Sequence, residues 1–251
     1  MEPTNAEPTN TGLEGAPATP AAGARRVSYW HTALLVVVLL VLSLGNSKSG
    51  HGIHSGHAHL RIYLVTIAYE WLLTGYVWWG VRRSGGTLRQ LVGGRWDDFG
   101  DFLLDVALAG GVWFTALMAI AMAAVAMGMG HGGSLDETRR QIGFLAPDSA
   151  LEIVVWIALS ATAGFCEELI FRGYLQRQFT HLLRSRWFAL PVVSILFGLG
   201  HGYEGPPRMV LIALLGFAFG MMSIARKSLR PAMMAHTLQD TISGLLLRAL
   251  R

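Results

Sequence analysis

The chain has 251 residues, of which 52% are hydrophobic and 14% charged, and its mean hydropathy is +0.42. Soluble globular domains are less apolar and more highly charged, so this composition excludes water as the main solvent of the fold. The formal net charge of +4 does not indicate a nucleic-acid partner, because the basic residues stand in short clusters between apolar runs rather than along one face. The single cysteine, Cys166, excludes an intramolecular disulfide framework.

The first 26 residues differ in composition from the rest of the chain. They are rich in Pro, Ala, Thr, Gly and Glu and lack apolar periodicity, which predicts a disordered cytoplasmic tail. A signal peptide is not expected, because the apolar run begins only after Arg25 and Arg26.

Residues 27–251 contain apolar segments near the length of ~20 residues that a helix needs to cross a hydrocarbon core of ~30 Å. They predict an all-α fold, a polytopic transmembrane helix bundle of about seven spans, with six to eight as the range. The segments begin near Val27, Leu60, Phe102, Ala150, Trp187, Met209 and Pro231.

The distribution of lysine and arginine predicts the orientation of these spans. With a cytoplasmic N-terminus and seven spans, 13 of the 20 basic residues fall on the cytoplasmic side, as the positive-inside rule favours. The 13 are Arg25, Arg26, Arg82, Arg83, Arg89, Arg95, Arg172, Arg177, Arg184, Arg186, Arg226, Lys227 and Arg230.

The loop between the first two predicted spans carries His51, His54, His57 and His59. Histidines so close together could bind a metal ion. A flexible surface loop is the favoured interpretation, because the spacing fits neither a helix nor a strand and no carboxylate accompanies the histidines in the sequence.

Ionisable residues inside the later spans are the informative ones, because a charge at mid-bilayer costs about 2.5–3.5 kcal/mol even on the lenient scale. Glu168 and Arg172 stand at i, i+4 and are predicted to pair, whereas Glu167 is rotated by about 100° and faces another direction. Two later spans contribute His201 and the pair His236 and Asp240.

These polar residues are predicted to share one cavity. Gly198 with Gly202 and Gly216 with Gly220 form small-xxx-small pairs, which let neighbouring helices approach closely. A single buried histidine is as often a packing residue as a functional one, but six ionisable residues in three of the last four spans are hard to explain by packing. Glu70 in the second span stands alone and is interpreted as structural or as an accessory of the cavity.

Three short motifs carry a resemblance to a known family. They resemble the EExxxR, FxxxH and HxxxN/D motifs of the CAAX protease and bacteriocin-processing (CPBP, or ABI) family of intramembrane proteases, which includes the type II CAAX prenyl endopeptidases. The resemblance covers about a third of the chain and places a catalytic core at about 150–250. The motifs read Glu167-Glu168-Leu-Ile-Phe-Arg172, Phe197-Gly-Leu-Gly-His201 and His236-Thr-Leu-Gln-Asp240.

The resemblance implies an endopeptidase that hydrolyses peptide bonds with an activated water. It implies that Glu167 is the general base and that His201 helps to hold the water. His236 and Asp240 would stand at the oxyanion side, and Glu168 with Arg172 would form an orienting ion pair.

Asp240 leaves the chemistry open, because an ionised aspartate cannot donate a hydrogen bond to an oxyanion. It can instead orient His236 or ligate a metal. Glu167, both histidines and Asp240 also make a plausible Zn²⁺ set, so a metal-free glutamate mechanism and a zinc mechanism remain alternatives.

The expected substrate is a protein or peptide, either a prenylated CaaX protein or an unprenylated peptide or membrane protein. The expected location is the membrane as a multi-pass protein, the plasma membrane if the source is prokaryotic. A non-catalytic membrane immunity or scaffold protein is an alternative. A transporter is disfavoured because the sequence contains no internal repeat of broken helices.

Overall fold

The computed structural model describes residues 27–46, 58–126 and 143–249. The predicted tail and three of the four loop histidines, His51, His54 and His57, lie outside these ranges. The elements are α1 (Tyr29–Asn46), α2 (Ala58–Arg83), α3 (Leu88–Val92), α4 (Phe99–Ala126), a 3-10 turn (Gly143–Leu145), α6 (Ala150–Glu168), a π-helix (Leu169–Leu175), α7 (Gln176–Leu183), α8 (Arg186–Gly200), a 3-10 turn (Gly202–Glu204), α9 (Pro206–Arg226) and α10 (Arg230–Ala249).

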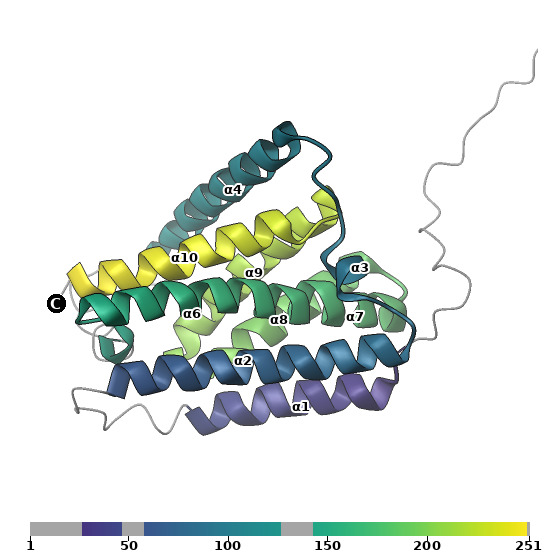
Figure 1. The fold of residues 1–251 in the computed structure, drawn as a ribbon, viewed down its shortest axis with the longest axis horizontal. Coiled ribbons are helices and arrows are strands. Elements are labelled where there is room, and N and C mark those ends of the chain that lie inside the picture. The colour runs from purple at the N-terminus through teal and green to yellow at the C-terminus, as the bar shows by residue number, and fades with distance from the viewer. Residues whose placement is uncertain (1–26, 47–57, 127–142, 250–251) are drawn as a thin grey trace, which may run out of the picture.

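The described residues form a bundle of helices without strands, so the predicted all-α membrane fold is confirmed (Figure 1). Three helical stretches are long and apolar enough to cross a membrane: Phe99–Ala123, Ala150–Leu183 and Pro206–Arg226. Tyr29–Ser43 and Arg186–Gly200 are shorter apolar helices.

The helices α2 and α10 also begin near predicted spans but are less apolar. Arginines, a glutamate and many tyrosines and tryptophans lower the hydropathy of α2, and α10 carries His236 and Asp240. Polar groups of this kind are tolerated in a membrane where they face the interior of a bundle. The number of spans therefore stays a prediction.

The longest helical stretch, residues 150–183, begins with a capping box and changes its winding in the middle. The Ser149 hydroxyl accepts from the backbone N–H of Glu152, and the Glu152 side chain accepts from the backbone N–H of Ser149. Directly after Glu168 the winding becomes that of a π-helix, in which all seven residues are buried. Such segments are rare and are frequently found at functional sites.

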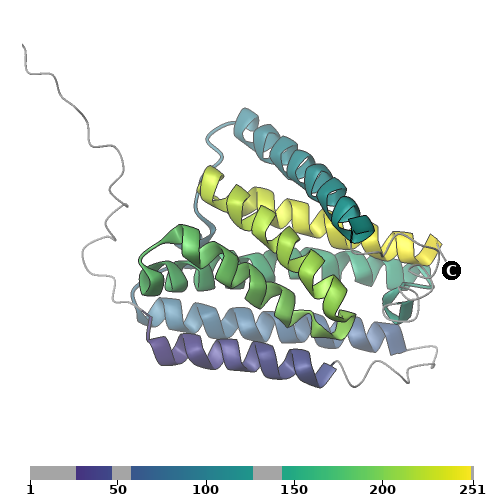
Figure 2. The same ribbon diagram turned by 180° about the vertical axis from the view of Figure 1, so that it is seen from behind.

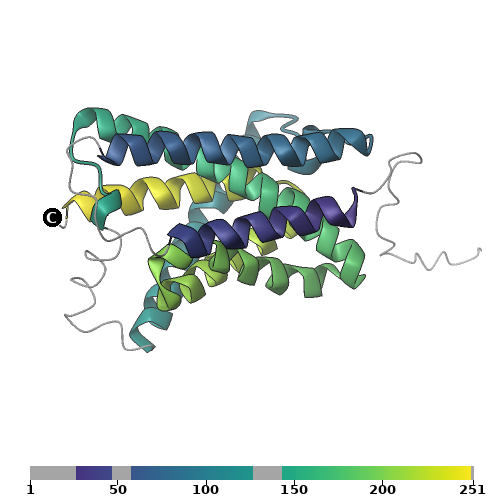
Figure 3. The same ribbon diagram turned by 90° about the horizontal axis from the view of Figure 1, so that it is seen from below.

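The hydrophobic core is built around this π-helix. Phe171, Tyr174 and Leu175 pack with residues of α1, α2 and α8 in one cluster. A second cluster joins α4, α9 and α10. Seen from behind, α8 and α9 cross over α6 and α10 (Figure 2), and the view from below shows α1 lying along α8 (Figure 3).

Glycines allow the close approach of helices that the sequence predicted. A methyl group added at Gly198 would collide with the backbone oxygen of Met209 on α9. One added at Gly216 would meet Arg172 at 2.7 Å and Phe197 at 2.8 Å. The predicted close approach of neighbouring helices at Gly198 and Gly216 is therefore present in the structure.

Candidate active site

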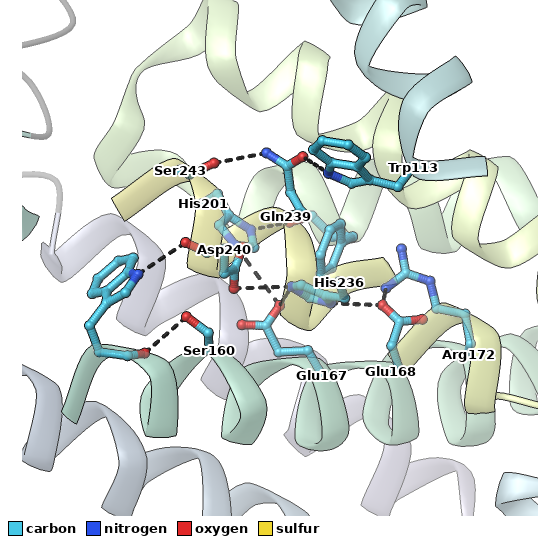
Figure 4. Close-up of polar contacts among 12 residues, drawn as sticks. Trp113, Ser160, Glu167, Glu168, Arg172, His201, His236, Gln239, Asp240 and Ser243 are labelled. Atoms are coloured by element: carbon cyan, nitrogen blue, oxygen red, sulfur yellow. Dashed lines mark hydrogen bonds and ion pairs between the residues drawn. The ribbon is translucent and has the colours of Figure 1, made fainter. Parts of the chain in front are cut away.

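The carboxylate of Glu168 lies at the centre of the buried part of the site (Figure 4). Its Oε1 accepts a hydrogen bond from Arg172 Nη1 at 2.8 Å, which is the predicted i, i+4 ion pair. The same oxygen lies 2.9 Å from Nδ1 of His236 on α10. Both side chains of the ion pair are shielded from solvent, with exposed fractions of 1% for Arg172 and 0% for Glu168.

The guanidinium of Arg172 is held on two further sides. Its Nη2 donates to the backbone oxygen of Gly216 on α9 at 2.9 Å. Its central carbon lies 4.2 Å from the centroid of the Phe197 ring, within cation–π range. The π-helix thus places this charged group against α8 and α9, next to the Glu168 carboxylate that contacts α10.

The carboxylate of Glu167 faces a different space, as its position one residue earlier predicted. Its Oε2 lies 3.9 Å from Nε2 of His201 and 3.9 Å from Nε2 of His236. This oxygen is buried and has no hydrogen-bond partner within the described protein. Because buried carboxylates are almost always satisfied, the position calls for a ligand such as water.

Contacts at Nδ1, the ring nitrogen that does not face Glu167, set the orientation of both imidazoles. Nδ1 of His201 lies 2.9 Å from the backbone oxygen of Phe197, and Nδ1 of His236 lies 2.9 Å from Glu168. Since both of these partners are acceptors, each Nδ1 carries a proton. The Nε2 atoms of both rings are therefore the ones presented to Glu167.

Asp240 stands at the edge of the site. Its Oδ2 lies 3.5 Å from His236 Nε2, and 34% of its side chain is exposed. Trp156 Nε1 donates to its backbone oxygen at 3.0 Å and so ties α10 to α6. Asp240 thus flanks the Nε2 side of His236, whereas the carboxylate at Nδ1 belongs to Glu168, because α6 packs along α10.

The structure therefore brings all six predicted residues together, in two layers. Glu168, Arg172 and His236 are almost inaccessible, whereas 15% of Glu167 and 18% of His201 are exposed. The layer with Glu167 is the more exposed of the two.

One comparison with known proteins bears on this arrangement. Residues 149–242 match the family model described as type II CAAX prenyl endopeptidase Rce1-like. This segment belongs to the CAAX protease family. It contains all three motifs and every residue of the two layers. No curated protein and no solved structure matches the chain.

Some polar contacts around this site were not predicted from the sequence. Glu70 is only 6% exposed, and its Oε2 is buried without a hydrogen-bond partner in the described protein. It interacts electrostatically with Glu167 and Asp240, so it is not isolated as its place in the second span suggested. Glu70 comes near the site because α2 packs against α6.

A second missed contact secures α10 beside the site. Trp113 Nε1 on α4 donates to Gln239 Oε1 at 2.8 Å, and Gln239 Nε2 donates to Ser243 Oγ at 2.9 Å. In the sequence, only the position of Gln239 next to Asp240 pointed to a role for Gln239 near the site.

The predicted zinc set does not form one compact group. Bonds of ~2.0–2.2 Å to a tetrahedral Zn²⁺ bring ligand atoms to within about 3.4 Å of one another. The two Nε2 atoms instead lie 3.9 Å from Glu167 Oε2. Among the described residues, a group of three His, Asp and Glu side chains has all its ligand atoms within 4.8 Å of one another. It lies elsewhere, at His59, Asp148 and Glu152. The separations at Glu167 leave room for a bound water.

Proposed function

We propose that this protein is an intramembrane endopeptidase of the CAAX protease type, with Glu167 as the general base. One observation carries the proposal: the buried Oε2 of Glu167 lacks a partner and faces the Nε2 atoms of two imidazoles whose Nδ1 atoms are both bonded elsewhere. Such an arrangement suits a water held between the Glu167 carboxylate and the acceptor Nε2 of His201, on one side of a peptide bond.

The chemistry follows from these positions. A water between Glu167 and His201 gives its proton to Glu167 as its oxygen bonds to the scissile carbonyl carbon. Glu167 then returns the proton to the amide nitrogen, and the C–N bond breaks to leave a carboxylic acid and an amine. A general base placed in this way contributes about 10²–10⁴-fold to the rate.

His236 stands where the oxyanion would develop. Its Nε2 can donate to an oxyanion in the imidazolium form, a charge that Glu168 on one side and Asp240 on the other can offset. Glu168 with Arg172 supports this ring and does not touch the substrate.

The substrate is a protein or peptide that reaches the membrane. The family name favours a prenylated C-terminal substrate, and an unprenylated peptide or membrane protein is the alternative. A multi-pass location is proposed, in the plasma membrane if the source is prokaryotic.

Cleavage assays in liposomes with prenylated and unprenylated forms of the same peptides test this function. The proposal expects fragments from at least one form, separated by mass spectrometry, and none from Glu167→Gln protein. A folded wild-type protein that cleaves no member of the panel, but binds it, would favour the immunity or scaffold alternative.

A further inference from the structure

A second cluster of chemically active side chains lies far from the catalytic layer. His59 stands in the first turn of α2, Asp148 just before α6 and Glu152 in the first turn of α6. Glu152 precedes Glu167 by 15 residues, 167 minus 152, which is ~22 Å along a helix. The proposed peptidase mechanism uses none of the three.

The distances within this cluster fit a shared metal ion better than hydrogen bonds. His59 Nδ1 lies 3.6 Å from Asp148 Oδ2 and 3.5 Å from Glu152 Oε2. Ordinary hydrogen bonds of this kind span about 2.7–3.2 Å, so both contacts are longer and count as ion pairs when His59 is protonated. Ligand atoms around a tetrahedral Zn²⁺ lie ~3.4 Å apart when the bonds to the metal are ~2.0–2.2 Å.

Two of the three side chains are held in place. Glu152 Oε2 accepts from the backbone N–H of Asp148 at 2.7 Å and of Ser149 at 3.3 Å, and only 6% of the side chain is exposed. The His59 ring is stacked with Tyr63, with centroids 6.4 Å apart and planes at 19°. Hydrogen bonds to ligating carboxylates and fixed imidazoles are the usual surroundings of a protein metal site.

The donor types select the class of ion. Mg²⁺ and Ca²⁺ prefer oxygen ligands alone, whereas an imidazole nitrogen with carboxylate oxygens suits Zn²⁺ and similar transition metals. We infer that His59, Asp148 and Glu152 form a transition-metal site that links the start of α2 to the start of α6. Zn²⁺ is the ion used to test this site. The histidine-rich loop lacks neighbouring carboxylates in sequence, but the fold supplies two of them to His59.

Metal binding to the folded chain should stabilise it by mass action. The purified full-length protein, stripped with a chelator, is titrated with Zn²⁺ against a competing indicator dye. His59→Ala and Glu152→Gln should each bind one zinc ion fewer, or bind it at least ~10–100-fold more weakly, the loss typical for even an outer partner of a metal ligand. In these variants the zinc-dependent rise in melting temperature should disappear together with the zinc binding.

The variants are chosen to separate metal binding from folding. Glutamine at the third helical position still completes a capping box, so Glu152→Gln keeps the start of α6 intact. His181→Ala, at an exposed histidine of α7, is the matched control and should bind zinc as wild type does. X-ray absorption of the loaded protein should show nitrogen and oxygen ligands at ~2.0–2.2 Å.

Two results would overturn the site. Wild-type zinc affinity in both His59→Ala and Glu152→Gln would remove these side chains as ligands. Loss of binding in a protein with His51, His54 and His57 all changed to alanine, together with normal binding by His59→Ala, would place the ion in the loop alone. Because activity is not the readout, neither result depends on the proposed peptidase function.

Discussion

Glu168 Oε1 lies 2.9 Å from Nδ1 of His236, across 68 positions of the sequence. This contact fixes the imidazole so that its Nε2 atom turns to Glu167. It also links the buried ion pair to the layer that reaches solvent. The site therefore depends on how α6 and α10 pack as much as on the residues that would touch a substrate.

Removing the guanidinium of Arg172 should destabilise the fold. Arg172→Ala leaves Glu168 buried with one cation fewer, and breaking a buried pair costs about 3–5 kcal/mol in the free energy of unfolding. Thermal unfolding in detergent measures the loss. Arg208→Ala breaks a more exposed i, i+4 pair with Glu204 and should cost at most about 1 kcal/mol. Equal melting temperatures of the two variants would contradict the supporting role of Arg172.

Gly216 should be sensitive to a single methyl group. In Gly216→Ala the new methyl would lie 2.7 Å from Arg172 Nη2 and 2.8 Å from Phe197 Cδ1, so the ion pair must shift. Overpacking of this kind costs about 1–3 kcal/mol, and the peptidase rate should fall with it. Gly111→Ala on α4 has no atom within 4 Å and should be neutral or slightly stabilising. Unchanged stability and rate in Gly216→Ala would count against this packing.

The i, i+4 spacing was enough to predict the Glu168–Arg172 pair, because neighbouring turns of one helix bring such residues together. The rest of the site depends on distant segments. Spacing alone could not show that Glu168, rather than Asp240, meets His236 Nδ1, since this follows from the packing of α6 on α10. The neighbours of Glu70 and the carboxylates beside His59 could not be predicted for the same reason: these partners lie on distant segments of the chain.

Asp240→Asn should retain substantial activity. If Asp240 only flanks His236 Nε2, the amide can still accept one hydrogen bond and can donate another to an oxyanion. As a zinc ligand, the neutral amide would bind metal much more weakly. Peptidase activity is therefore measured beside bound metal and chelator sensitivity. Activity lost together with stoichiometric zinc in this variant would instead support the metal mechanism.

The orientation of the bundle is testable with single cysteines in a Cys166→Ala background. The 13 to 7 split of basic residues predicts that cysteines at Ser55 and Asp136 react with an impermeant reagent outside intact cells. Cysteines at Arg89 and Ser185 should react only after the cells are opened. Labelling of all four from outside would rule out the seven-span arrangement.

The most direct test of the account is the single-turnover cleavage rate of Glu167→Gln protein in liposomes, on a peptide that the wild-type protein cleaves. Glutamine keeps the size of the side chain but cannot take a proton from water, so the rate should fall by about 10²–10⁴-fold while the melting temperature stays near that of wild type. Glu204→Gln, at a glutamate outside the two layers, should keep the wild-type rate. A folded Glu167→Gln protein that cleaves as fast as wild type would contradict the assignment of Glu167 as the general base.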